Sequence, residues 1–396
     1  MTTIKPRAPA RRTASGNKTA SGKETFLTAE QVLNLSPRRA WEVFPDKIAA
    51  EHRIFTEGKG LPPASALNTP IEYTLADQKR LAEWYRASPE PVAEADGLDL
   101  DAKTARGVLQ ADGKDLSLPG FLPDHLDFHP LPPLALIDPR LRDLIAPHQD
   151  AVMSPRIRID KPSMRVYPWC TIGKVFKSYP PYTSDALVAS GFMFGGRVMI
   201  TARHVFPSNI HDSFAWGARY RFAPGWDGTV VPAEPFGSAR VVAVRGKEKD
   251  SGILWASVNG SDYAACKLDW RIGDLSGALG VYCFGDSDSY KNRFYNSAGY
   301  PDFNNTNPVQ ELLVQVRDVD GGYRERELET RNFAGPGWSG GPLFGYLNES
   351  GDTRVVGVCS GKERFDSFLP PWSNLVFAGG RRFVDLAQYT VDHWWT

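Results

Sequence analysis

The chain has 396 residues, and its 46 Lys and Arg side chains are balanced by 46 Asp and Glu, so its formal net charge is zero. This balance excludes a protein that coats nucleic acid with a wholly basic surface, and we expect no nucleic-acid partner. Hydrophobic residues make up 42% of the chain and aromatic residues 12%, enough for a large core. No apolar run approaches the ~18–20 residues that a membrane-spanning helix needs, so we predict no membrane span.

Residues 1–27 are predicted to be a disordered basic tail. The first 24 residues hold six basic side chains, one acidic side chain and no apolar stretch of the kind that a secretory signal contains. No pair of cysteines has CxxC spacing, which disfavours both a zinc site and a disulfide framework. The sequence therefore predicts a cytoplasmic protein, although the acid-poor, Arg-containing tail also fits an organellar transit peptide.

Residues 28–115 carry the signals of helices. Thr28 is followed three residues later by Gln31, the spacing of a capping box, and apolar residues come directly after it. A second helix is expected to start at Thr74. We therefore predict a helical N-terminal extension over this range.

Residues 116–151 are rich in proline and leucine. Proline removes backbone donors and favours extended chain, so this segment is predicted to be a linker or a strap. Its many leucines favour a strap that covers another surface, and such a strap could restrain the remainder of the chain from within the molecule.

Residues 152–396 have a different pattern. Short apolar runs of strand length recur between Gly, Pro, Asn and Asp, as in residues 186–194, 198–201, 239–244, 280–284, 311–316 and 355–359. This pattern is typical of an all-β barrel or sandwich. Only residues 381–394, at the end of the chain, show helical spacing of apolar side chains.

Three motifs in this second half carry chemistry. They are Ile200–His204, which ends an apolar run, Asp262–Leu268, and Gly335–Leu343 with the sequence GPGWSGGPL. Any one of them alone fits a structural histidine, a turn aspartate or a glycine-rich turn. A serine hydroxyl becomes a nucleophile when a histidine takes its proton and a carboxylate holds that histidine in place. The three motifs together supply this set.

The third motif also offers the backbone donors that such chemistry needs. The N–H groups of Gly337 and Ser339 are candidates for an oxyanion hole, because glycine lets the backbone turn its N–H groups inward without a Cβ clash. The order His, Asp, Ser along an all-β chain is that of the chymotrypsin-like double barrel.

Residues 152–396 resemble a trypsin-like serine peptidase, nearest the V8 or glutamyl-endopeptidase-like branch. The segments that carry the resemblance are Tyr167–Lys174, Ser190–His204, Asp262–Leu268, Asn296–Pro301, Ser339–Phe344 and Val356–Val358. The resemblance implies two packed antiparallel β-barrels with a C-terminal helix, preceded here by a partly helical, Pro-rich extension. It implies a serine endopeptidase that cleaves protein or peptide substrates with no metal or cofactor. In it, His204 is the general base, Asp262 its orienter and Ser339 the nucleophile.

The sequence departs from the family pattern at several positions. Trp338 stands where trypsin has the acid that pairs with a freshly cleaved N-terminus, so that activation route is not expected. The substrate pocket is expected to be lined by Ala334, Cys359, Ser360 and Gly361. This set is largely apolar, so we do not predict specificity for glutamate.

Two other functions compete with this interpretation. Residues 337–341 also satisfy G-x-S-x-G, the nucleophile turn of α/β-hydrolase esterases, which needs a helix after the serine and a histidine later in the chain. A protease fold that has lost its chemistry and serves as a binding module is the second alternative.

Overall fold

The structure is a computed structural model. It describes residues 26–36, 38–39, 71–72, 92–94, 113–123, 125–131, 156–158, 165–178, 186–206, 218–226, 233–247, 260–291, 293–301, 309–330, 337–347, 351–363 and 374–395. The basic tail up to residue 25 and the helix expected at Thr74 lie outside these ranges.

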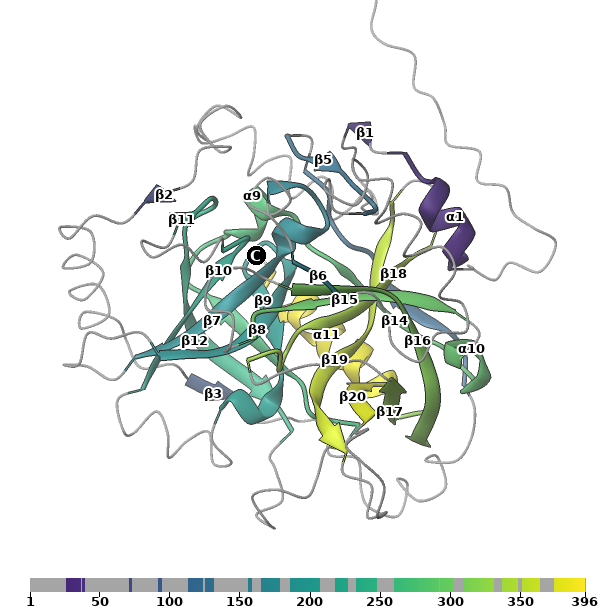
Figure 1. Cartoon of the computed structure of the whole chain (residues 1–396). Helices are drawn as coiled ribbons and strands as arrows, with labels where there is room; N and C mark the ends of the chain where they lie inside the picture. Colours follow the sequence, from purple (N-terminus) through teal and green to yellow (C-terminus); the bar gives the residue numbers. More distant parts are fainter. Residues whose placement is uncertain are drawn as a thin grey trace, which may run out of the picture.

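Six antiparallel strands close into a first barrel (Figure 1). Around the barrel they are β10 (Arg219–Pro224), β7 (Ile172–Ser178), β8 (Ala186–Gly195), β9 (Val198–Thr201), β13 (Ala264–Leu268) and β12 (Ala239–Gly246), and β12 pairs back onto β10. Every residue of β9 is buried, as expected for a short apolar strand inside a closed sheet.

A second barrel of six antiparallel strands follows along the chain. Its strands are β18 (Pro342–Tyr346), β15 (Phe294–Gly299), β16 (Val309–Gly322), β17 (Glu325–Thr330), β20 (Asn374–Gly379) and β19 (Thr353–Glu363), and β19 pairs with β18 to close it. The predicted fold class, two antiparallel barrels with a C-terminal helix, is confirmed. The α/β-hydrolase alternative is wrong, because strand β18 follows Ser339 where that fold needs a helix.

Helix α11 (Arg381–His393) is the last described helix and contacts elements of both halves (Figure 1). It begins directly after Gly380, whose φ of 99° lies in the left-handed region that glycine tolerates. Its apolar face buries Phe383, Leu386 and Ala387. Beyond the helix, Trp395 packs edge-on against Phe194 of β8 at 5.6 Å between ring centroids, which ties the end of the chain to the first barrel.

Shorter elements connect the barrels or flank them. They are β6 (Arg156–Arg158), η3 (Trp169–Thr171), η4 (Arg203–Val205), β11 (Ala233–Glu234), α9 (Gly273–Ser276), β14 (Gly280–Cys283) and α10 (Asp288–Lys291). Strand β14 runs parallel to β19 on the outside of the second barrel, and its other edge pairs with residues 116–118 of the N-terminal part of the chain. Among the described residues, no helix is long and apolar enough to span a membrane.

The described part of the N-terminal extension begins with helix α1 (Ala29–Asn34). The predicted capping box is confirmed: Gln31 N–H donates to Thr28 Oγ1 at 3.3 Å, and Thr28 N–H donates to Gln31 Oε1 at 2.8 Å. The extension also supplies the short strands β1 (Arg38–Arg39), β2 (Ile71–Glu72) and β3 (Val92–Glu94), and β3 pairs with β12 of the first barrel.

The described residues of the predicted strap pack against the barrels. Strand β4 (Leu116–Leu118) pairs antiparallel with β14, and β5 (Asp127–Phe128) pairs with β1. The ring of Phe128 is fully buried and meets Tyr346 of β18 edge-on at 5.6 Å. The strap thus completes the core beside the second barrel, while restraint of catalysis by the extension stays a prediction.

We predict that Phe128→Ala lowers the free energy of unfolding by about 3–5 kcal/mol, because the cavity left by a buried ring cannot fully collapse. Urea denaturation measures the change. Glu30→Ala, at an exposed position of α1, serves as the control and should change stability by less than about 1 kcal/mol. Equal effects of the two variants would show that the strap contributes nothing to the folded core.

The four cysteines are buried free thiols in the structure. Burial raises the pKa of Cys283 to about 11 and that of Cys170 and Cys266 further still, so none of these three is a thiolate at neutral pH. We predict that a thiol reagent labels no cysteine in the native chain and four in denaturant, as counted by mass spectrometry. Reductant should leave the melting temperature unchanged; a lowered melting temperature would reveal a disulfide.

Candidate active site

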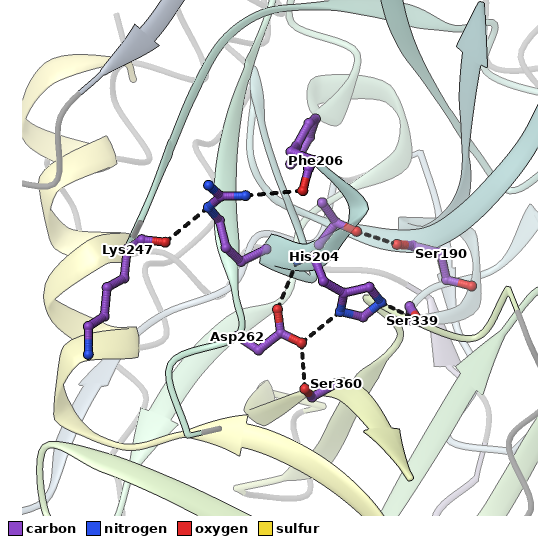
Figure 2. Close-up of polar contacts among 9 residues, drawn as sticks. Ser190, His204, Phe206, Lys247, Asp262, Ser339 and Ser360 are labelled. Carbon is purple, nitrogen blue, oxygen red and sulfur yellow. Dashed lines mark hydrogen bonds and ion pairs between the residues drawn. The ribbon is translucent and has the colours of Figure 1, made fainter. Parts of the chain in front are cut away.

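The structure brings His204, Asp262 and Ser339 together in one chain of hydrogen bonds (Figure 2). His204 Nε2 lies 2.9 Å from Ser339 Oγ, and His204 Nδ1 lies 2.7 Å from Asp262 Oδ2. An ionised carboxylate only accepts hydrogen bonds, so the Nδ1–H donates to Asp262 and leaves the Nε2 lone pair facing the serine hydroxyl. This tautomer is the one that can take a proton from Ser339.

The pairing of β9 with β13 explains why His204 and Asp262 meet. In this antiparallel pair Thr201 lies opposite Ala264. His204 comes three residues after Thr201, and Asp262 comes two residues before Ala264, so both lie beyond the same end of the pair. Asp262 Oδ1 also accepts the backbone N–H of His204 at 2.9 Å, which fixes the short helix η4 that carries the histidine.

Asp262 is nearly enclosed, with 8% of its side chain exposed, whereas His204 is 32% exposed. Burial by itself would raise the pKa of Asp262. The hydrogen bonds and charge of His204, together with a bond from Ser360, outweigh burial and hold the pKa of this carboxyl below its usual value. Asp262 is therefore an anion at neutral pH.

Ser360 is a fourth member of this group. Its Oγ donates to Asp262 Oδ2 at 2.5 Å, so this carboxylate oxygen accepts from both Ser360 and His204. Sequence reasoning placed Ser360 only in the wall of the substrate pocket and missed this contact. Ser360 and Asp262 are 98 residues apart, and no local pattern pairs them.

Ser339 lies on a turn that its neighbours hold in place. Gly337 and Gly340 have φ values of 89° and 88°, which side chains other than glycine rarely adopt. Gly340 N–H donates to the carbonyl of Cys359 at 2.8 Å, and Gly341 N–H donates to that of Trp338 at 2.9 Å. These bonds connect the turn to β19 and keep Ser339 at its tip.

Trp338, just before the serine, is anchored in the second barrel. Its indole is 1% exposed, and Nε1–H donates to Ser297 Oγ of β15 at 3.2 Å. Trypsin has an acid at this position that pairs with a new N-terminus, whereas this tryptophan packs into the core. The turn is therefore anchored without a cleaved terminus.

The four residues predicted to line the substrate pocket differ in their placement. Cys359 is 2% exposed and belongs to the apolar cluster of the second barrel. Ser360 faces Asp262, and Gly361 is half-buried. Ala334 lies outside the described residues. No group of three or more His, Cys, Asp or Glu side chains suited to a metal ion occurs in the part of the chain that the structure describes.

We predict that Ser360→Ala lowers the free energy of unfolding by about 1.5–3 kcal/mol at neutral pH, the range for a hydrogen bond to a charged group. A carboxyl whose pKa is lowered by folding stabilises the fold above its unfolded pKa and loses that contribution as pH falls through its folded pKa. The difference in the free energy of unfolding between wild type and Ser360→Ala should therefore narrow below pH ~3.8, near the ordinary pKa of Asp.

Urea denaturation from pH 7 to pH 2 measures this difference. Ser117→Ala, at a half-buried serine of β4, is the control. A difference that stays constant with pH would mean that Ser360 does not interact with an ionised Asp262.

Comparison with known proteins finds a matching family model and similar solved structures. Residues 189–358 match the family model of the trypsin-like peptidase domain. A Glu endopeptidase solved in complex with MPD is 18% identical, with a TM-score of 0.43 over 61% of this chain and 98% of its own. The protease Anisep from Arthrobacter nicotinovorans is also 18% identical, with a TM-score of 0.38 over 57% of this chain and 97% of its own.

A comparison with curated proteins finds no match. The segment matched by the family model holds all three motif residues, and it spans strands of both barrels. The family predicted from the motifs is confirmed at this level, whereas the nearer assignment to the V8 branch stays a prediction. Residues 189–358 are thus similar to the trypsin-like peptidase domain.

Proposed function

We propose that the chain is a serine endopeptidase that cleaves peptide bonds through an acyl-enzyme on Ser339. The observation that carries the proposal is the unbroken series of hydrogen bonds from Asp262 through His204 to Ser339, at 2.7 and 2.9 Å. A serine hydroxyl that merely ends a turn does not need a histidine whose other nitrogen is held by a buried carboxylate.

In the first half-reaction Ser339 Oγ attacks the carbonyl carbon of the substrate, and its proton passes to His204 Nε2. The imidazole becomes a cation, which the carboxylate of Asp262 stabilises at Nδ1. His204 then gives the proton to the leaving amine, and the acyl group stays on Ser339. Water, activated by the same histidine, releases the acid and restores the serine.

The negative charge that develops on the substrate oxygen needs donors fixed in advance. The backbone N–H groups of Gly337 and Ser339 are proposed for this role, because the glycine-rich turn presents them beside the nucleophile. This mechanism uses neither a metal nor a cofactor.

Protein or peptide chains are the proposed substrates, and an apolar side chain is proposed for the pocket. The apolar preference follows from the residue types predicted to line the pocket, Ala334, Cys359, Ser360 and Gly361. None of the four offers a charged partner to an acidic substrate side chain.

We predict that Ser339→Ala and His204→Ala each lower kcat by several orders of magnitude and that the double variant is little worse, because the three residues act as a unit. A peptide library incubated with the purified full chain, with products read by mass spectrometry, measures both cleavage and specificity. EDTA should have no effect.

Ser117→Ala and His393→Ala are the matched controls, at a half-buried serine of β4 and an exposed histidine at the end of α11, and both should cleave like wild type. Undiminished cleavage by Ser339→Ala would contradict the proposal. Absence of cleavage by wild type across the library would favour the binding module, a protease fold without its chemistry.

A further inference from the structure

We propose that Ser190 is a positioning residue that fixes the backbone of residues 337–339 and thereby aims the two oxyanion donors. The inference rests on the proposed peptidase function. Ser190 lies on β8 of the first barrel, and its side chain is fully buried. It touches none of the reacting groups through its side chain, yet it contacts the turn that carries Ser339.

Ser190 holds the turn at two carbonyls. Its Oγ donates to the carbonyl of Gly337 at 2.8 Å, and its backbone N–H donates to the carbonyl of Ser339, also at 2.8 Å. One residue of the first barrel therefore fixes the Gly337–Trp338 and Ser339–Gly340 peptide planes, which flank the Trp338–Ser339 peptide. The N–H of Ser339 lies between these two planes, and the N–H of Gly337 lies directly before the first of them.

The hydroxyl of Ser190 has little freedom to turn away. Tyr300 N–H donates to Ser190 Oγ at 2.8 Å, and a backbone N–H can only donate. This bond occupies a lone pair of the oxygen and leaves the hydroxyl proton for the carbonyl of Gly337. Ser190 thus links the turn to the residue that follows β15 of the second barrel.

Ser190 is itself fixed by its neighbour on β9. Thr201 Oγ1 donates to the backbone carbonyl of Ser190 at 2.7 Å. Thr201 precedes His204 by three residues, so the strand that leads to the general base also supports the residue that holds the nucleophile's turn. The barrel that carries His204 is in this way coupled to the position of Ser339.

The atoms around Ser190 and the turn are closely packed. A Cβ at Gly340 would lie 2.1 Å from the carbonyl oxygen of Ser190 and 2.2 Å from Thr201 Oγ1. A Cβ at Gly299 would lie 3.0 Å from Ser190 Oγ and 2.8 Å from the ring of Trp338. The two glycines let the turn approach Ser190 closely enough for both hydrogen bonds.

Loss of the Ser190 hydroxyl should affect the transition state more than substrate binding. Oxyanion donors act on charge that develops only as the bond to Ser339 forms, so a small loss of their alignment lowers kcat and leaves KM largely unchanged. Removing the hydroxyl of Ser190 leaves the carbonyl of Gly337 without this donor and frees its peptide plane to rotate. The bond between His204 and Asp262 is untouched by that change.

The test compares Ser190→Ala with wild type and with Ser276→Ala in the full chain. Ser276 is another fully buried serine, and its Oγ donates to the carbonyl of Gly277 at 3.2 Å, in α9 and away from the turn. We expect Ser190→Ala to lower kcat roughly 10- to 100-fold at similar KM, somewhat less than loss of an oxyanion donor itself. A peptide aldehyde, which forms a tetrahedral adduct on the serine, should bind more weakly by a similar factor.

Two further readouts separate positioning from a general structural role. The pH profile of kcat/KM should keep its shape in Ser190→Ala, because the histidine and its carboxylate are unchanged. Hydrogen exchange at the amides of residues 337–341 should accelerate in Ser190→Ala and not in Ser276→Ala. Ser190→Cys retains a weak donor, so its kcat should lie between those of wild type and Ser190→Ala. It replaces Ser190→Ala if the alanine variant fails to fold.

Wild-type kcat in Ser190→Ala, or an equal loss in Ser276→Ala, would overturn the inference while leaving the proposed function in place. If wild type itself cleaves nothing, the proposed function fails, and hydrogen exchange alone then decides whether Ser190 holds the turn. Unchanged exchange at residues 337–341 would overturn it in that case as well.

Discussion

The bond between His204 and the enclosed carboxylate of Asp262 is the interaction on which the rest of the site depends. Burying a carboxylate costs free energy unless it accepts hydrogen bonds. Asp262 accepts one each from the imidazole of His204, the backbone N–H of His204 and the hydroxyl of Ser360. These bonds keep Asp262 charged and the imidazole in one tautomer. Ser339 then meets a nitrogen that can accept its proton.

This arrangement requires two barrels that meet in a fixed relation. His204 and Asp262 come from one end of the β9 and β13 pair, whereas Ser339 comes from the turn before β18 in the other barrel. Trp338 anchors that turn to the second barrel, and Ser190 connects it to the first. Within the described residues, helix α11 contacts β13 of the first barrel and β17 of the second, and the strap adds buried contacts beside the second barrel.

The features that the sequence predicts well are local. The positions of the main strands, the capping box at Thr28, the C-terminal helix and the motifs around His204, Asp262 and Ser339 each follow from residues close together in the chain. Motif order then predicts the double barrel. The contacts of Ser360 with Asp262 and of Ser190 with Gly337 span 98 and 147 residues, and a serine in a strand carries no mark of its partner. The pairing of β4 with β14 is of the same non-local kind.

The most direct measurement of the central claim is covalent labelling of the full chain with a fluorophosphonate, because only an activated serine reacts with it. The account predicts one adduct per chain at Ser339, mapped by mass spectrometry, with labelling at least about 100-fold slower in His204→Ala because the base is lost. Wild-type chain that stays unlabelled, or that carries its adduct on another serine, would contradict it. So would equally fast labelling of Ser339 in His204→Ala.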